Sequence, residues 1–109
     1  MSKLITRLRR VDANQKEIVS TLRKLGIAVA ITSGVGQGFP DIVCGYRGVN
    51  YLFEIKDENK PPSERELTEK EQKFFNNWRG QIAMILNAQE AIDIMTADAD
   101  TNILTKRPG

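Results

Sequence analysis

The segment YLFEIK, which ends at Lys56, constrains the fold most because it places a carboxylate inside an apolar, strand-forming run. A charge at such a position is costly unless it is paired or binds a cation. Side chains alternate along a strand, so Glu54 and Lys56 share one face while Phe53 and Ile55 share the other. The sequence therefore predicts a strand whose polar face has a chemical role.

A second run, DIVCGY, begins at Asp41 and is joined to the first by the short segment RGVN, which predicts a β-hairpin. If Tyr46 faces Tyr51, Asp41 faces Lys56 and becomes a diagonal neighbour of Glu54, with α-carbons about 7–8 Å apart. A slip of one residue would move Asp41 to the opposite face. This register predicts that two carboxylates converge on one face of a sheet.

The first predicted helix covers residues 12–25. Asp12 is its expected N-cap, with Gln15 completing a capping box, and Gly26 is expected to end it. Its predicted buried stripe consists of Ile18, Leu22 and Leu25. An apolar run directly after the glycine predicts a buried strand over residues 27–32.

The second half of the chain predicts a helix, a strand and a helix. Thr68 with Glu71 forms a capping box for a helix ending near residue 78, and a strand is expected over residues 81–86. Asn87 with Glu90 predicts a last helix to about residue 97. The expected buried side of the middle helix is Phe74, Phe75 and Trp78.

The resulting order, α-β-β-β-α-β-α, predicts an α/β fold with a mixed sheet flanked by helices. The last strand follows a helical crossover and should be parallel to an earlier one. A chain of 109 residues suits a single domain over residues 1–109. Residues 1–11 are expected to form a basic arm, either contacting phosphates or simply solvated, and residues 98–109 a polar, frayed tail.

Composition excludes several classes of enzyme. There is no histidine, so serine–histidine–aspartate triads, cysteine–histidine pairs and nucleases with a histidine base are excluded. A single cysteine precludes an intrachain disulfide and fits a reducing compartment, so we expect a cytoplasmic protein. No apolar run approaches the roughly 18 residues of a membrane span, so no membrane partner is expected. Hydrolysis by this chain would have to use carboxylates, lysine and a hard metal ion.

The predicted polar face suits such an ion. Two carboxylates beside a backbone carbonyl match the oxygen ligands that Mg²⁺ and Mn²⁺ prefer, and the carbonyl of Ile55 is a plausible third ligand. The ion would polarise a phosphodiester and acidify a bound water. Lys56 could orient that water and steady the developing charge. The alternative is a structural ion pair of Asp41, Glu54 and Lys56 at a strand end.

Pro40-Asp41 followed by Glu54-Ile55-Lys56 resembles the PD-(D/E)XK nuclease superfamily. Within it, the segments GFPDIV, FEIK and L-T-x-x-x-Q resemble the VRR-NUC group of small nucleases, which is common in phages and related to Holliday-junction resolvases. The resemblance covers residues 12–92. It implies a restriction-endonuclease-like core in a protein of a bacterial or phage-infected cell.

The same resemblance implies roles for individual residues. Asp41, Glu54 and the Ile55 carbonyl would hold the metal, and Lys56 would assist the attacking water. Glu17, on the first helix, would be a further metal ligand, with a solvated helix residue as the alternative. Gln72, on the second helix, would face the site as a catalytic residue, although glutamines are common on helix surfaces.

Three functions follow as hypotheses. The first is an endonuclease that hydrolyses DNA phosphodiester bonds, in its sharper form selective for branched DNA or Holliday junctions. The second is a catalytically silent nucleic-acid-binding module on a nuclease fold, which the complete motif disfavours. The third is a sequence-specific restriction-like enzyme, which the small size disfavours. The choice between DNA and RNA stays open at this point.

A homodimer is the expected assembly because resolving a four-way junction needs two incisions. The candidate dimer surface is Leu4, Ile5, Leu8 and Val11, which recur near helical spacing. The cations interleaved with them, which could meet phosphates at the edge of the interface, are Arg7, Arg9 and Arg10. The alternative is a monomer with a frayed basic tail.

Overall fold

The computed structural model describes the backbone of residues 2–106 and the side chains of residues 13–97. The predicted order of elements and the α/β class are confirmed, with one short 3₁₀ turn added. The elements are α1 (Ser2–Lys24), β1 (Ala28–Ile31), β2 (Ile42–Tyr46), β3 (Val49–Ile55), η1 (Pro62–Glu64), α2 (Glu69–Asn77), β4 (Gln81–Ile85) and α3 (Ala88–Lys106).

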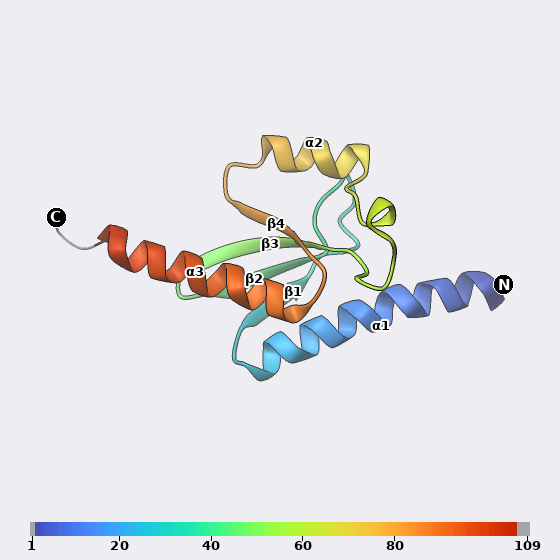
Figure 1. The fold of residues 1–109 in the computed structure, drawn as a ribbon, viewed down its shortest axis with the longest axis horizontal. Coiled ribbons are helices and arrows are strands. Elements are labelled where there is room, and N and C mark those ends of the chain that lie inside the picture. The colour runs from blue at the N-terminus through green and yellow to red at the C-terminus, as the bar shows by residue number, and fades with distance from the viewer. Residues whose placement is uncertain (1, 107–109) are drawn as a thin grey trace.

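The four strands form one mixed sheet in the order β1-β2-β3-β4. The first three strands are antiparallel, and β4 is parallel to β3, as predicted for a strand reached through a helix. Helix α2 lies over one face of the sheet, and α1 and α3 lie over the other (Figure 1). The sheet is therefore a layer between helices, and each face has its own set of partners.

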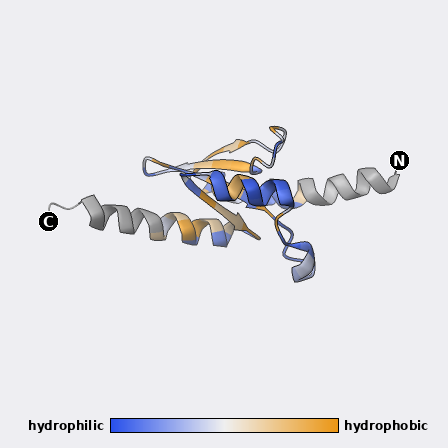
Figure 2. Ribbon diagram, turned by 90° about the horizontal axis from the view of Figure 1, so that it is seen from above, coloured by the Kyte–Doolittle hydropathy of each residue, from blue (hydrophilic) through white to orange (hydrophobic). Residues whose placement is uncertain are grey.

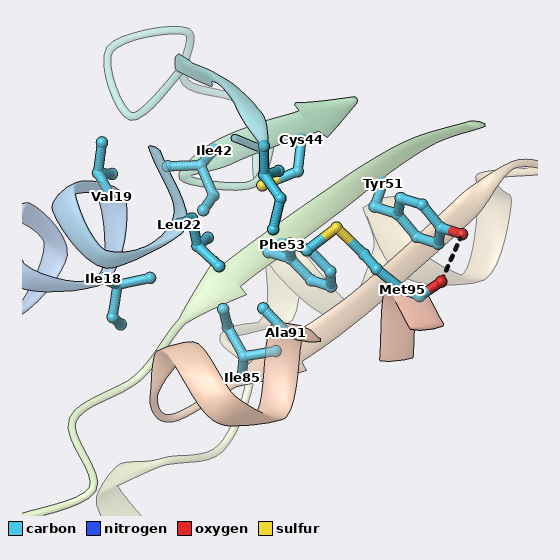
Figure 3. Close-up of a cluster of buried hydrophobic side chains, with 11 residues drawn as sticks. Ile18, Val19, Leu22, Ile42, Cys44, Tyr51, Phe53, Ile85, Ala91 and Met95 are labelled. Carbon is cyan, nitrogen blue, oxygen red and sulfur yellow. Dashed lines mark hydrogen bonds between the residues drawn. The ribbon is translucent and has the colours of Figure 1, made fainter. Parts of the chain in front are cut away.

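The core lies between the sheet and the helix pair α1 and α3 (Figure 3). Within it, the hydroxyl of Tyr51 donates to the carbonyl of Met95 at 3.5 Å. Cys44 is fully buried there, and burial raises the pKa of its thiol to about 11. The buried residues of this core are Ile18, Val19, Leu22, Ile27, Ile42, Cys44, Tyr51, Phe53, Ile85, Ala91 and Met95.

Hydropathy follows the same layering. The strands are largely apolar, and the loops that connect them are largely hydrophilic (Figure 2). Strand β1 is an exception to the predicted burial, because it is an edge strand and only Val29 among its residues is half-buried. Across the part of the chain that the structure describes, no helix combines the length and apolarity needed to cross a membrane.

Helix α1 begins much earlier than predicted, at Ser2. Asp12 and Gln15 lie inside it, so the predicted capping box is wrong; residues 2–11 contain no glycine or proline that would stop the helix from extending. Gln15 instead donates to the hydroxyl of Ser33 at 3.4 Å. The side chains predicted to form the basic arm and the dimer surface, within residues 1–11, lie outside the described side chains.

The end of α1 agrees with the prediction. Gly26 has φ of 85°, and the N–H of Ile27 donates to the carbonyl of Leu22 at 3.1 Å, which closes a Schellman motif. Leu25 lies beyond the last helical turn and is 60% exposed, so its predicted burial is wrong. Val19 takes its place in the core, beside Ile18 and Leu22.

The predicted N-terminal caps of α2 and α3 are confirmed, but the predicted buried face of α2 is not. Thr68 and Glu71 form the predicted box at α2, but the aromatic residues of that helix are at most half-buried, and Trp78 is 39% exposed at its C-cap. The N–H of Glu90 donates to the side chain of Asn87 at 2.9 Å, as expected for a cap. Helix α3 continues to Lys106, past the predicted end near residue 97. The predicted fraying of residues 107–109 lies outside the described residues.

Candidate active site

The β2–β3 hairpin sets the geometry of the candidate site. Tyr46 faces Val49 across a two-residue turn, in which Arg47 and Gly48 have φ of 51° and 79°, as in a type I′ turn. The predicted pairing of Tyr46 with Tyr51 is therefore wrong by two residues, because the turn is shorter than expected. An even shift leaves every side chain on its predicted face.

With this register Asp41 lies level with Glu54 rather than diagonal to it. The N–H of Asp41 donates to the carbonyl of Phe53 at 3.0 Å, and its Oδ2 accepts from the N–H of Ile55 at 2.8 Å. These two hydrogen bonds flank Glu54 on both sides. The structure thus brings the two carboxylates together on one face of the sheet.

The segment that leads into Asp41 is held by contacts with Thr32 and with α2. The N–H of Thr32 donates to the carbonyl of Asp41 at 2.8 Å, and the Thr32 hydroxyl donates to the carbonyl of Pro40 at 2.8 Å. Gly38 packs so closely on α2 that a Cβ there would lie 2.5 Å from the carbonyl oxygen of Lys70. The glycine-rich loop is therefore tied to β1 on one side and to α2 on the other.

Lys56 follows β3 directly, and its N–H donates to the carbonyl of Ile85 in β4 at 3.0 Å. Its Nζ lies 3.6 Å from Oε2 of Glu54 and 2.8 Å from Oε1 of Glu71 on α2. The side chains of Lys56 and Glu71 are 16% and 17% exposed. The lysine therefore bridges the acidic pair on the sheet and an acid on the covering helix.

The site has more buried negative charge than positive charge. Glu54 is 5% exposed, and burial, together with the charges of Asp41 and Glu71, raises its pKa to about 9. Burial also raises the pKa of Asp41, although the N–H of Ile55 opposes the shift. Such a cluster favours the uptake of a proton or of a cation.

The charges of Lys56 and Glu71 support each other. Burial lowers the pKa of Lys56, but the hydrogen bond and charge of Glu71 outweigh it, with the charges of Glu54 and Asp41, and the net pKa is raised. For Glu71, burial acts to raise the pKa, whereas hydrogen bonds from Lys56 and from the N–H of Thr68 lower it overall. Both groups are therefore held in their charged forms.

Glu71 is a site residue that the sequence prediction missed, and Gln72 is not in the same place. Gln72 is exposed and donates to the side chain of Asn76 at 3.0 Å. The sequence predicted Glu71 only as a capping residue, but that capping role could have indicated its place in the site. A carboxylate at the third helical position points back toward the N-cap, and here the N-cap lies beside the site.

The structure does not bring Glu17 to the acidic pair. Glu17 is exposed on α1, which lies on the core side of the sheet (Figure 1). Within the described part of the chain, no three histidine, cysteine, aspartate or glutamate residues are grouped so that they could hold a metal ion. A metal ion at this site would therefore rely on Asp41, Glu54 and backbone or solvent oxygens.

Comparison with known proteins gives a family match. A family model described as archaeal Holliday junction resolvase (Hjc) matches residues 7–101, a range that includes Asp41, Glu54, Lys56 and Glu71. No curated protein and no solved structure gives a significant match. The match supports the resemblance to PD-(D/E)XK nucleases of the resolvase type, and the narrower VRR-NUC grouping stays a prediction.

Proposed function

Because the chain belongs to the archaeal Holliday junction resolvase (Hjc) family, a PD-(D/E)XK-type family of nucleases, we propose that it is a divalent-metal-dependent endonuclease that cuts branched DNA. The observation that carries the proposal is the placement of Asp41 level with Glu54 on one sheet face, with Nζ of Lys56 3.6 Å from Glu54. An acidic pair can hold a divalent cation, and a lysine beside it adds positive charge where negative charge develops during phosphodiester hydrolysis.

The residues present fit a divalent cation. Glu54 is a carboxylate buried to 5% exposure beside a second carboxylate, and its nearest cation, Lys56, is shared with Glu71, so a further cation would stabilise the acidic pair. Magnesium in phosphoryl-transfer sites uses one or two carboxylates and completes its shell with water and substrate phosphate. Asp41 and Glu54 would hold the ion, with the carbonyl of Ile55 as a further proposed ligand, and Mn²⁺ would suit the same oxygens.

The chain's own groups have separate tasks in hydrolysis. A bound divalent cation supplies Lewis acidity to the phosphodiester and lowers the pKa of a water molecule. Asp41 is held by Thr32 and Ile55, so its carboxylate is oriented before substrate arrives. The Lys56 ammonium, held beside Glu54, contributes positive charge where the pentavalent phosphate gains negative charge, and it can orient the attacking water.

A homodimer is part of the proposal. A four-way junction has paired strands and needs two incisions, and a C₂ dimer supplies two sites related by the same symmetry. The described part of the chain has one acidic pair with a lysine, at Asp41, Glu54 and Lys56. We keep residues 1–11 as the candidate dimer and phosphate-contacting surface.

A cleavage assay on defined substrates tests the proposal. The protein would be incubated with a four-way junction, a flapped duplex and a linear duplex of matched sequence, with Mg²⁺, with Mn²⁺ or with EDTA. We expect cleavage of the junction in either metal and none in EDTA, with loss of cleavage in Asp41→Asn. Equal cutting of linear duplex would refute selectivity for branched DNA. Tight junction binding without any cleavage would instead favour the silent binding module.

Sedimentation at micromolar protein, alone and with the junction, tests the assembly. A dimer that makes paired incisions in one junction is the expected result. A monomer that nicks single strands independently would refute the dimeric part of the proposal and leave the nuclease activity standing.

A further inference from the structure

Lys56 reaches away from the sheet and ends against α2. Its Nζ is closer to Glu71, at 2.8 Å, than to Glu54, at 3.6 Å. Both members of the closer pair are less than one-fifth exposed, so solvent screens them less than it would a surface ion pair. The position of the ammonium group is therefore set mainly by a residue outside the PD-(D/E)XK motif.

Glu71 is itself held at two points. Its Oε1 accepts from the N–H of Thr68 at 2.8 Å, and its own N–H donates to the Thr68 hydroxyl at 3.2 Å. The oxygen that caps the helix is the same one that accepts from Lys56. The capping box therefore fixes the carboxylate in the orientation that the lysine meets.

The helix that carries Glu71 is anchored to the segment that carries Asp41. Gly38 lies against the backbone of Lys70, and Phe39 packs edge-on against Phe74 with ring centroids 5.2 Å apart. Asp41 follows two residues after Phe39 in the chain. The acidic pair and the group that aims the lysine are thus parts of one packed unit.

We infer that Glu71 is a positioning residue for Lys56: the carboxylate, fixed by its capping box, holds the ammonium group over the Asp41–Glu54 pair for hydrolysis. The inference rests on the proposed nuclease function and adds a residue to it. A lysine side chain loses considerable rotamer freedom when it is fixed, so an uncharged residue at this position would leave Nζ distributed over several rotamers. Glu71 acts through Lys56 and not on the substrate.

The chain offers matched variants that separate this role from helix capping. Glu71→Gln keeps a side chain that can complete a capping box and removes the charge that faces Lys56. Glu69→Gln makes the same change two residues earlier on the same helix, at a side chain that is 87% exposed and faces Lys73. Thr68→Ala removes the hydroxyl cap and leaves the backbone N–H that binds Glu71.

The measurement is the single-turnover cleavage rate of a four-way junction at saturating protein, together with junction affinity in EDTA and the melting temperature. For Glu71→Gln we expect the rate to fall about 10- to 100-fold, the range in which misplacing a catalytic group costs rate. Its affinity for the junction should not fall, since no charge that attracts DNA is lost. Glu69→Gln should cleave like the wild type. Thr68→Ala should melt earlier but lose much less rate than Glu71→Gln below its transition, because the N–H of residue 68 still binds the Glu71 carboxylate.

Two results would overturn the inference. One is a rate for Glu71→Gln equal to or above that of the wild type, which would mean that Glu71 does not aim the lysine. The other is a parallel loss of rate in Thr68→Ala and Glu71→Gln that follows their melting temperatures, which would mean a purely structural role. Failure of the wild-type protein to cleave any substrate would refute the proposed function instead, so the two failures are distinguishable.

Discussion

Replacing Glu54 with glutamine should stabilise the metal-free protein at neutral pH. The native state holds the Glu54 proton up to about pH 9, whereas an unfolded chain releases it near the ordinary value of 4.5. Folding therefore takes up a proton within this window, and the free energy of unfolding falls as the pH rises through it. Glutamine is neutral in both the folded and the unfolded state, so Glu54→Gln removes this contribution to the pH dependence of the free energy of unfolding.

The size of the effect follows from the two pKa values. One pH unit within the window is worth about 1.4 kcal/mol, so between pH 4.5 and 7 the wild type loses up to about 3 kcal/mol that Glu54→Gln keeps. The nearly complete burial of Glu54, at 5% exposure, means that solvent screening reduces this little. The full effect is therefore a large part of the stability of a domain of this size.

Urea unfolding in EDTA at a series of pH values measures this directly. The two proteins should have similar midpoints near pH 4.5 and should diverge steadily toward pH 7, with equal slopes against urea. Glu64→Gln, at an exposed position in η1, is the control and should follow the wild type. A constant difference between Glu54→Gln and the wild type across this range would refute the argument that Glu54 holds a proton in the fold.

Three further predictions concern the same region. Millimolar Mg²⁺ or Mn²⁺ should raise the melting temperature of the wild type and leave that of Asp41→Asn unchanged, because only a site that binds the ion is stabilised by it; an equal rise in both would exclude Asp41 as a ligand. Lys56→Ala should reduce the cleavage rate by 10²-fold or more, while its circular dichroism spectrum stays native and it still binds the junction. Undiminished cleavage would reject the role of that lysine. Gly38→Ala should lower the free energy of unfolding by about 1 kcal/mol or more beyond the loss in Gly36→Ala, as measured by urea unfolding. Both glycines have positive φ, but only at Gly38 would the new Cβ meet the Lys70 carbonyl. Equal losses would show that the contact with α2 adds nothing.

Local signals in the sequence predicted the elements that local chemistry determines. The Thr68–Glu71 capping box and the glycine at residue 26 were found because each depends on residues a few positions apart. The shared face of Asp41 and Glu54 could also be predicted, because it depends only on the parity of the hairpin register. The register itself could not, since Arg47 at positive φ is an unusual residue for the first position of a type I′ turn.

Tertiary packing determines the two features that the sequence did not predict, the rotation of α2 and the burial of β1. Glu71 and Gln72 are successive residues on a helix, about 100° apart around its axis, and either could have faced the site. The rotation of α2 depends on its contacts with Gly38 and Phe39, which come from a distant loop. The burial of β1 likewise depends on its edge position, which a single apolar run does not reveal.

The tight β2–β3 turn makes the acidic pair a product of short-range folding. Asp41 and Glu54 lie on adjacent strands of one hairpin, and contacts at such short sequence separation form early and at small entropic cost. The position of Lys56 depends on the hydrogen bond of its N–H to β4 and on the ion pair with Glu71 of α2, and both elements come later in the chain. The two carboxylates thus meet across a single hairpin, whereas the position of the lysine depends on β4 and α2, which lie farther along the chain.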